Sequence, residues 1–345
     1  MYVIANWKGK VLKSSNKNVF ISKIRLLSSR NPVLGTLVIF ILVIIAFTIF
    51  SPIKNSFPVF ISGENIKNIL EQTAGISIAA FGMTLVLLVG GIDLSVGSLL
   101  ALISVVSANL LEKYNFSIVL TVLICLCIGF TVGLLNGLII TRFRVQPFLV
   151  TLGTLSIVKG LAYVISQGES VYISNRMFGQ IFVHGSILMI PVSVLWTIIF
   201  LFIMFILVSK TKFGRRVQAV GGNELAAITS GVNVKSIKVF SYVICGGVSA
   251  FSGMILVSRL GTGMPSVGAG FELNVIAAVV LGGTGFSGEG GNMFGTLLGS
   301  LVIGTIMNGL TILGVSSYIQ DVIKGAVIIL TIVSSSILIA RREER

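Results

Sequence analysis

Apolar stretches without charged residues recur along most of the chain and are separated by short polar segments. The first runs from Val33 to Phe50 and is closed by Ser51 and Pro52. About 18 or more apolar residues are enough for a helix to cross the hydrocarbon layer of a membrane. The pattern therefore predicts membrane-spanning helices at about 33–50, 73–89, 95–111, 117–140, 148–166, 191–209, 237–258, 272–283, 294–313 and 319–340.

Glycine interrupts two of these stretches. Leu85 to Leu102 contains Gly90-Gly91-Ile92-Asp93-Leu94-Ser95, and the apolar stretch Leu273 to Leu281 ends at Gly282-Gly283. At membrane depth, backbone groups freed by such a break are tolerated only against protein or water, so paired breaks point to a transport pathway. We expect an all-α integral membrane protein of about ten transmembrane helices with broken or re-entrant segments. The candidate pathway or gate residues are Gly90, Gly91, Asp93, Ser95, Asn136, Asn274, Gly282, Gly283 and Asn308.

Asp93 is the acidic residue most deeply embedded in apolar sequence. An ionised carboxylate at the centre of a bilayer costs at least about 2.5 kcal/mol, so Asp93 needs a polar partner or water. Two interpretations stay open. Asp93 lines or gates a pathway, or Asp93 or Ser95 caps the helix that follows by accepting its free backbone amides.

Composition supports the membrane interpretation. Of 345 residues, 54% are hydrophobic and 10% are charged. A soluble domain carries about 25% charged residues, so a soluble protein and large soluble catalytic domains are excluded.

The net charge of +14 reflects topology. If the amino terminus is inside, 18 of the 25 lysines and arginines fall on the inner side, 5 on the outer side and 2 within spans. Basic residues near span ends resist translocation, so both termini are predicted to be cytoplasmic, and no nucleic-acid partner is expected. We divide the chain into a basic cytoplasmic tail at 1–32, without a cleaved signal peptide, one permease domain at 33–340 and a short cytoplasmic tail at 341–345.

The longest polar insert on the predicted inner side is the loop 210–236. Asn223 is a good helix N-cap, Glu224 suits the first turn, and Gly231 is placed to end the helix two turns later. A connection between two spans needs only a handful of residues. The short helix therefore indicates a docking surface, with a solvated interfacial helix as the alternative.

Residues for hydrolytic or metal chemistry are missing. No Gly-Lys-Ser/Thr sequence, which ends a phosphate-binding loop, occurs in the chain. His184 is the only histidine, and no ladder of charged residues runs through the spans as a proton- or sodium-coupled carrier would show. We expect no catalytic residues, no metal site and no cofactor in this chain.

Three separated motifs, in order, resemble the membrane permease of the ribose-type ABC sugar importers, and the similarity runs from about residue 33 to 335. They are Gly91-Ile92-Asp93-Leu94-Ser95-Val96-Gly97-Ser98, the segment from Gly214-Arg215 through Gly221-Gly222-Asn223-Glu224 to Ser230-Gly231-Val232, and the segment from Glu272 through Ala277-Ala278-Val279-Val280-Leu281-Gly282-Gly283-Thr284 to Gly314-Val315-Ser316-Ser317-Tyr318.

This resemblance implies a multi-pass permease of the cytoplasmic (inner) membrane that pairs with a second permease chain, as a homodimer. It implies two further partners: a cytoplasmic ATP-binding subunit that holds ATP and Mg, and an extracytoplasmic sugar-binding protein. The expected cargo is a monosaccharide, ribose first. Nucleosides, other sugars or a furanosyl signal are alternative cargoes, and a secondary carrier is the rival class. The implied ATPase-coupling residues are Gly214, Arg215, Gly221, Gly222, Asn223, Glu224, Ala227 and Gly231.

Overall fold

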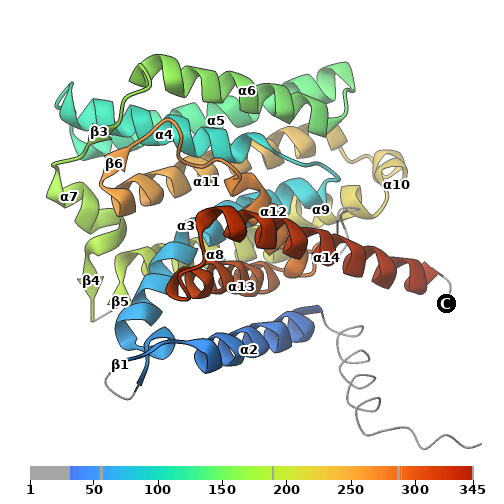
Figure 1. The fold of residues 1–345 in the computed structure, drawn as a ribbon. Helices are drawn as coiled ribbons and strands as arrows, with labels where there is room; N and C mark the ends of the chain where they lie inside the picture. Colours follow the sequence, from blue (N-terminus) through green and yellow to red (C-terminus); the bar gives the residue numbers. More distant parts are fainter. Residues whose placement is uncertain (1–31, 55–56, 189, 286–287, 289, 344–345) are drawn as a thin grey trace, which may run out of the picture.

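The computed structural model describes residues 32–54, 57–188, 190–285, 288 and 290–343, which are mostly helical (Figure 1). The long helices are α2 (Pro32–Phe50), α3 (Gly63–Leu88), α4 (Ser95–Glu112), α5 (Ile118–Phe143), α6 (Pro147–Ser166), α8 (Val192–Lys210), α11 (Val234–Leu260), α13 (Met293–Ile312) and α14 (Ser317–Glu343). The shorter ones are α7 (Arg176–Gly179), α9 (Lys212–Gly222), α10 (Glu224–Thr229) and α12 (Phe271–Leu281).

Eight helices of the described part are long and apolar enough to cross a membrane: α2, α3, α4, α5, α6, α8, α11 and α13. Helix α12 has 11 residues, which at 1.5 Å per residue span about 16 Å, half of the hydrocarbon layer. The expectation of an all-α membrane protein is confirmed. The count of ten and the cytoplasmic position of both termini stay predictions. Of the predicted tail at 1–32, residues 1–31 lie outside the described residues, and Pro32 begins α2.

The strands of the described part are two residues long and form three antiparallel pairs. β1 (Ile53–Lys54) pairs with β2 (Phe57–Pro58), β4 (Ser186–Ile187) with β5 (Ile190–Pro191), and β3 (Val171–Tyr172) with β6 (Thr262–Gly263). In Figure 1 they lie at the end of the bundle that carries α7, while α9 and α10 lie at the opposite end. We call these the α7 end and the α10 end.

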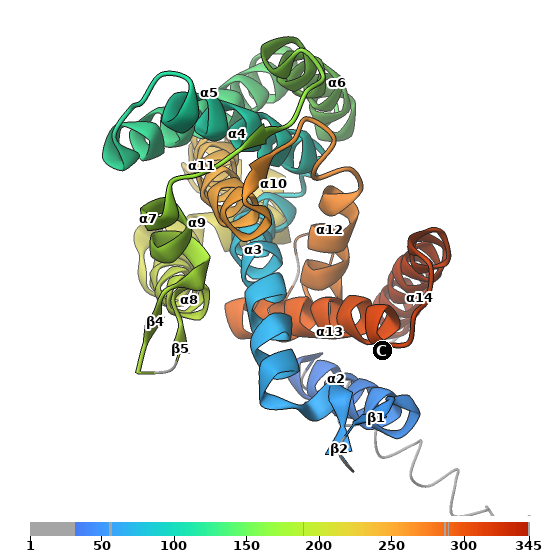
Figure 2. The same ribbon diagram turned by 60° about the vertical axis from the view of Figure 1, so that its left-hand side comes forward.

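Helix α3 is the centre of the bundle, with α11, α13, α8 and α12 packed around it (Figure 2). Every residue from 73 to 88 is buried. The helix begins ten residues before the predicted span at 73–89, so that boundary was wrong. The hydroxyl of Ser62 caps the helix by accepting the amide of Asn65, and Lys67 pairs with Glu71 at 3.8 Å. These polar residues extend the helix beyond its apolar part, where an apolar pattern gives no signal.

Helices α5 and α11 pack at close range through glycine. Gly129, Gly133 and Gly137 follow one another every fourth residue on α5, and a Cβ atom at any of them would collide with the backbone of α11. Small residues at this spacing let two membrane helices bring their backbones together. Gly129 lies against Gly246 and Gly137 against Val239, so the helices are antiparallel. The last turns of α5 therefore lie beside the first turns of α11, at the α10 end.

Candidate functional site

The break between α3 and α4 is a six-residue turn, 89–94, that ends in a buried carboxylate. Gly90 takes the left-handed conformation with φ +73°, and Asp93 is 2% exposed. One oxygen of Asp93, Oδ1, accepts hydrogen bonds from the amide of Ser95 at 2.9 Å and from its hydroxyl at 2.5 Å. Asp93 thus caps the first amide of α4, as one of the two interpretations predicted, while Ser95 does not cap the helix.

Hydrogen bonds connect Ser95 and the turn before it to helices α5 and α6. The amide of Asn136 on α5 donates to the hydroxyl of Ser95 at 3.1 Å, and the hydroxyl of Thr154 on α6 donates to Oδ1 of Asn136 at 2.6 Å. Thr151, also on α6, donates to the carbonyl of Ile92 in the turn at 3.0 Å. The broken segment is therefore fixed to α5 and α6 by polar contacts. We call Asp93, Ser95, Asn136, Thr151 and Thr154 the buried polar cluster.

The buried polar cluster lies within the bundle and not at its surface. Asn136 precedes the end of α5 by seven residues, and Thr154 follows the start of α6 by seven residues. At 1.5 Å per residue, both lie about 10 Å inside the α10 end. A hydrogen-bonded carboxylate at this depth is the kind of group that membrane proteins keep in functional positions.

The remaining predicted pathway residues do not all join this cluster. Gly90 and Gly91 belong to the turn, and Gly91 packs against the ring of Tyr242. Asn308 instead exchanges two hydrogen bonds of 3.0 Å with Asn65, near the α7 end. Three others lie along α12 and its end: Gly282 packs on the backbone of Gly295, Gly283 lies near Gly290, and Oδ1 of Asn274 is buried without a hydrogen-bond partner in the described structure.

The predicted coupling segment 210–236 folds into two helices, although only one was predicted. α9 is capped by Thr211, whose hydroxyl accepts the amide of Gly214 at 3.1 Å. α10 is the predicted helix: Oδ1 of Asn223 accepts the amide of Ala226 at 2.9 Å, and Gly231 has φ +79° after its end. Glu224 pairs with Lys238 of α11 at 2.7 Å.

The surface of α10 carries two large apolar side chains. Leu225 is 76% exposed and Ile228 is 53% exposed, whereas Ala227 faces inward and is buried. Two large exposed apolar side chains on a polar end of a membrane protein are a feature of contact surfaces. Glu224, Ala226 and Thr229 share the exposed face with these two large residues.

Helix α9 touches the broken helix directly. A Cβ atom at Gly221 would overlap the carbonyl oxygen of Leu88, the last residue of α3, and would lie 3.0 Å from the carbonyl oxygen of Gly288. The backbone of Gly288 also meets Leu88, and Gly291 packs on the Leu88 side chain. We call Leu88, Gly221, Gly288 and Gly291 the glycine junction. It joins the α9–α10 segment to a point five residues before Asp93.

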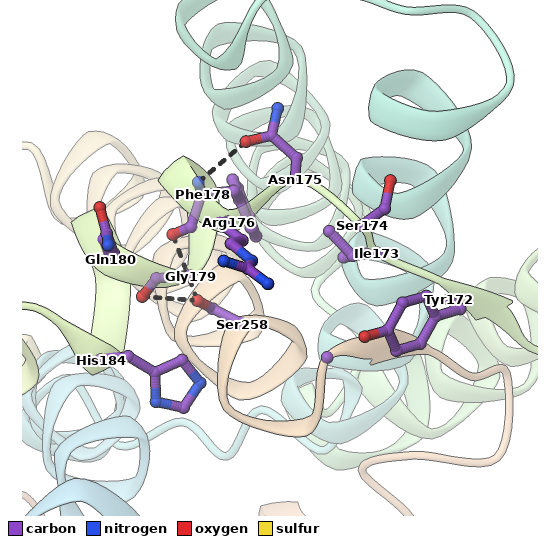
Figure 3. Close-up of a pocket in the computed structure, with 11 residues that line it drawn as sticks. Tyr172, Ile173, Ser174, Asn175, Arg176, Phe178, Gly179, Gln180, His184 and Ser258 are labelled. Atoms are coloured by element: carbon purple, nitrogen blue, oxygen red, sulfur yellow. Dashed lines mark hydrogen bonds between the residues drawn. The ribbon is translucent and has the colours of Figure 1, made fainter.

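The α7 end carries a pocket of about 340 Å³ that the sequence did not reveal (Figure 3). The carboxylate of Glu112 supports its wall by accepting the amide and hydroxyl of Ser174 at 2.9 and 2.6 Å, and Asn175 caps α7 through the amide of Phe178 at 3.2 Å. In Figure 3 the side chains of Arg176 and His184 lie at the pocket. Single polar residues scattered over a loop gave no spacing signal. The segments are brought together by the pairing of β3 with β6, by the Glu112–Ser174 contact and by the hydroxyl of Ser258, which donates to the carbonyl of Phe178 at 3.3 Å.

These features define a multi-pass helical membrane protein with a broken core helix and an exposed helical segment at one end. The chain belongs to the family described as branched-chain amino acid transport system / permease component, which matches residues 65–332. It is therefore an ABC transporter permease of the inner membrane.

Several curated permeases are similar over most of their length. The ribose import permease protein of Bacillus subtilis is 44% identical over 276 residues, which cover 80% of this chain and 85% of that protein. The ribose import permease protein of Haemophilus influenzae is 40% identical over 303 residues, covering 87% and 92%. The D-allose transport system permease protein of Escherichia coli is 35% identical over 295 residues, covering 86% and 89%. No solved structure matches the chain.

The buried polar cluster yields a stability prediction. Asn136→Ala removes both the donor to Ser95 and the acceptor of Thr154, so it should lower the free energy of unfolding by about 1–3 kcal/mol. The measurement is thermal unfolding of the purified chain in detergent. Thr131→Ala is the matched control on the same helix, because Thr131 is exposed and, among the described residues, hydrogen-bonds only to the carbonyl of Cys127. Equal melting temperatures for the two variants would contradict a stabilising role of the cluster.

Proposed function

We propose that this chain is the membrane-spanning subunit of an ATP-driven importer that moves ribose into the cell. Its similarity to permeases named for ribose import, over 85–92% of their length, is the observation that carries the proposal. Permeases named for D-allose and L-arabinose are also similar, at 35% and 36% identity. Another monosaccharide is therefore the second candidate cargo, ahead of a nucleoside or a furanosyl signal.

The partners of the importer follow from the two ends of the bundle. The α10 end is the cytoplasmic side, since it carries the basic segment 210–238, and Leu225 and Ile228 there offer an apolar surface to a cytoplasmic ATP-binding subunit that holds ATP and Mg. The α7 end is then extracytoplasmic, and its pocket with Arg176 and His184 lies where an exported sugar-binding protein would dock. A second copy of this chain completes the permease.

Coupling runs from the α10 segment to the broken helix. A movement of α9 and α10 driven by the ATP-binding subunit reaches Leu88 through the glycine junction, because backbone atoms in direct contact leave no soft side chain to absorb it. Leu88 leads into the turn at 89–94, which the buried polar cluster fixes to α5 and α6. Two arrangements of this unit supply inward- and outward-open states, which the ATP-binding subunit biases by its differential contacts.

The function is tested by uptake into proteoliposomes. The permease with an ATP-binding subunit and a ribose-binding protein should accumulate labelled ribose only when ATP and both partners are present, and ionophores should have no effect. Ionophore-sensitive uptake by the chain alone would contradict an ATP-driven importer and favour a secondary carrier. If an allose- or arabinose-binding protein supports ATP-dependent uptake of its sugar while the ribose-binding protein supports none, the class is right and the cargo is that sugar.

Docking of the ATP-binding subunit is tested at α10. Leu225→Glu places a charge on the exposed apolar face without disturbing the cap at Asn223, so it should reduce co-purification of the ATP-binding subunit at least about tenfold. Leu188→Glu is the matched control, because Leu188 is 91% exposed at the opposite end. If both variants retain the subunit equally, α10 is not its contact surface.

A further inference from the structure

A second pocket, of about 130 Å³, opens between α4, α6 and the segment that leads into α12. It is separate from the pocket at the α7 end. In Figure 2, α12 lies below α6 and beside α14. Its lining comes from the first turns of α4, the middle of α6, the segment 265–270 and Glu272.

This pocket lies at the depth of the membrane interior. Gly263 packs against Ser104 and Ala108 on α4, but five residues later Gly268 packs against Gly97, in the first turn of α4. The segment after β6 therefore runs back into the bundle, and α12 begins inside it. On α6, Lys159 lies 12 residues after Pro147 and 7 before Ser166, which places it about 18 Å and about 10 Å from the two ends of the helix.

Two opposite charges face this pocket without pairing. The carboxylate of Glu272, in the first turn of α12, lies against Gly97 and is hydrogen-bonded to the backbone at Gly270 and Glu272. It also interacts electrostatically with Lys159 and Lys324. Lys324 has its own partner, Asp321, at 2.8 Å. In the described structure Lys159 forms no hydrogen bond or ion pair, and Glu272 forms no ion pair, although the two residues line the same pocket. Ionisable residues at this depth are expensive in lipid, and they mark transport pathways.

The chemistry of the lining suits a neutral polyol. The ammonium of Lys159 offers only donors and the carboxylate of Glu272 only acceptors, and their charges cancel, so a ligand without net charge can bond to both. Sugar hydroxyls donate and accept. The hydroxyls of Ser98 and Ser266 and the apolar side chains of Ala101, Leu155 and Val267 complete a lining of mixed polarity.

We propose that this pocket is a sugar-binding site within the permease, where Glu272 and Lys159 hydrogen-bond the hydroxyls of a sugar in transit. The proposal rests on the function proposed above and adds the residues that contact the cargo. The volume of the pocket is smaller than the volume of about 300 Å³ or more that is usual for tight ligand sites. The pocket thus holds one edge of the sugar and binds it weakly, as a transported ligand must be able to leave. Lys159 is exposed, so the site is open on one side.

The test compares ribose with its monodeoxy analogues in the reconstituted importer. Glu272→Gln keeps the shape of the side chain but removes its charge, so ribose uptake should fall at least about tenfold, the loss of a charge-assisted hydrogen bond. For the analogue that lacks the hydroxyl bound by Glu272, uptake by the variant should equal uptake by the wild type. ATP hydrolysis stimulated by the loaded binding protein should persist. Glu64→Gln, an exposed acid at the α7 end, is the control and should transport every analogue as the wild type does.

Three results separate the possibilities. If Glu272→Gln takes up ribose at the wild-type rate, the proposed site is wrong. An equal loss of uptake for ribose and every analogue also overturns the site, because Glu272 then supports only the structure of α12. No ribose uptake by the wild-type importer contradicts the proposed function itself. If Glu272→Gln fails to fold, Lys159→Gln serves as the second variant in the same uptake assay. Lys159 is exposed, so its substitution leaves the packing of the bundle intact. It should show the same selective pattern, with a different monodeoxy analogue insensitive to the substitution.

Discussion

The hydrocarbon layer contains no water to satisfy a backbone that leaves the helix, and this constraint governs the centre of the molecule. Between Leu88 and Ser95 the chain breaks its helix about 10 Å inside one end of the bundle, where each freed polar group needs a partner within the protein. Asp93 caps α4, Thr151 bonds to Ile92, and Asn136 joins Ser95 to Thr154. The break is thereby tied to neighbouring helices, and a movement of one must be accommodated by the others.

The same break is in backbone contact with the exposed helical segment at the α10 end. Glycine makes this possible, because Gly221 allows the carbonyl of Leu88 to approach where a side chain would stand, and Gly288 closes the contact from a third segment. An exposed apolar face on α10, a rigid glycine junction and a broken helix thus follow one another over a short path. Within the proposed importer, this path connects the partner that hydrolyses ATP to the part of the permease that opens and closes.

Much of this could be predicted from sequence where a local rule applies. Apolar stretches predicted the helical membrane class, the resemblance of three motifs predicted the permease family, and Asn223 with Gly231 predicted α10. The glycine pair at 90–91 and Asp93 correctly marked the break. The polar first turns of α3 were missed because Glu64, Asn65 and Lys67 carry no apolar pattern, and α9 was missed because its helix has polar residues over much of its surface.

Contacts between distant segments could not be predicted in this way. Asn136 and Asn308 stand in similar Asn-Gly-Leu sequences, yet one joins the buried polar cluster and the other pairs with Asn65 near the opposite end. Which glycine touches which backbone depends on how the helices cross. Gly221 and Gly222 are adjacent and look alike in sequence, yet within the described part of the chain only Gly221 has another segment within 4 Å of its Cβ position.

That difference between two adjacent glycines gives the most direct measurement. Gly221→Ala inserts a methyl group into the glycine junction, whereas Gly222→Ala adds the same group in open space. In the reconstituted importer, Gly221→Ala should retain the ATP-binding subunit and its ATP hydrolysis but take up at least about fivefold less ribose per ATP hydrolysed, because overpacking a close contact costs about 1–3 kcal/mol. Gly222→Ala should couple as the wild type does. Equal ratios of uptake to hydrolysis in the two variants would contradict coupling through the glycine junction.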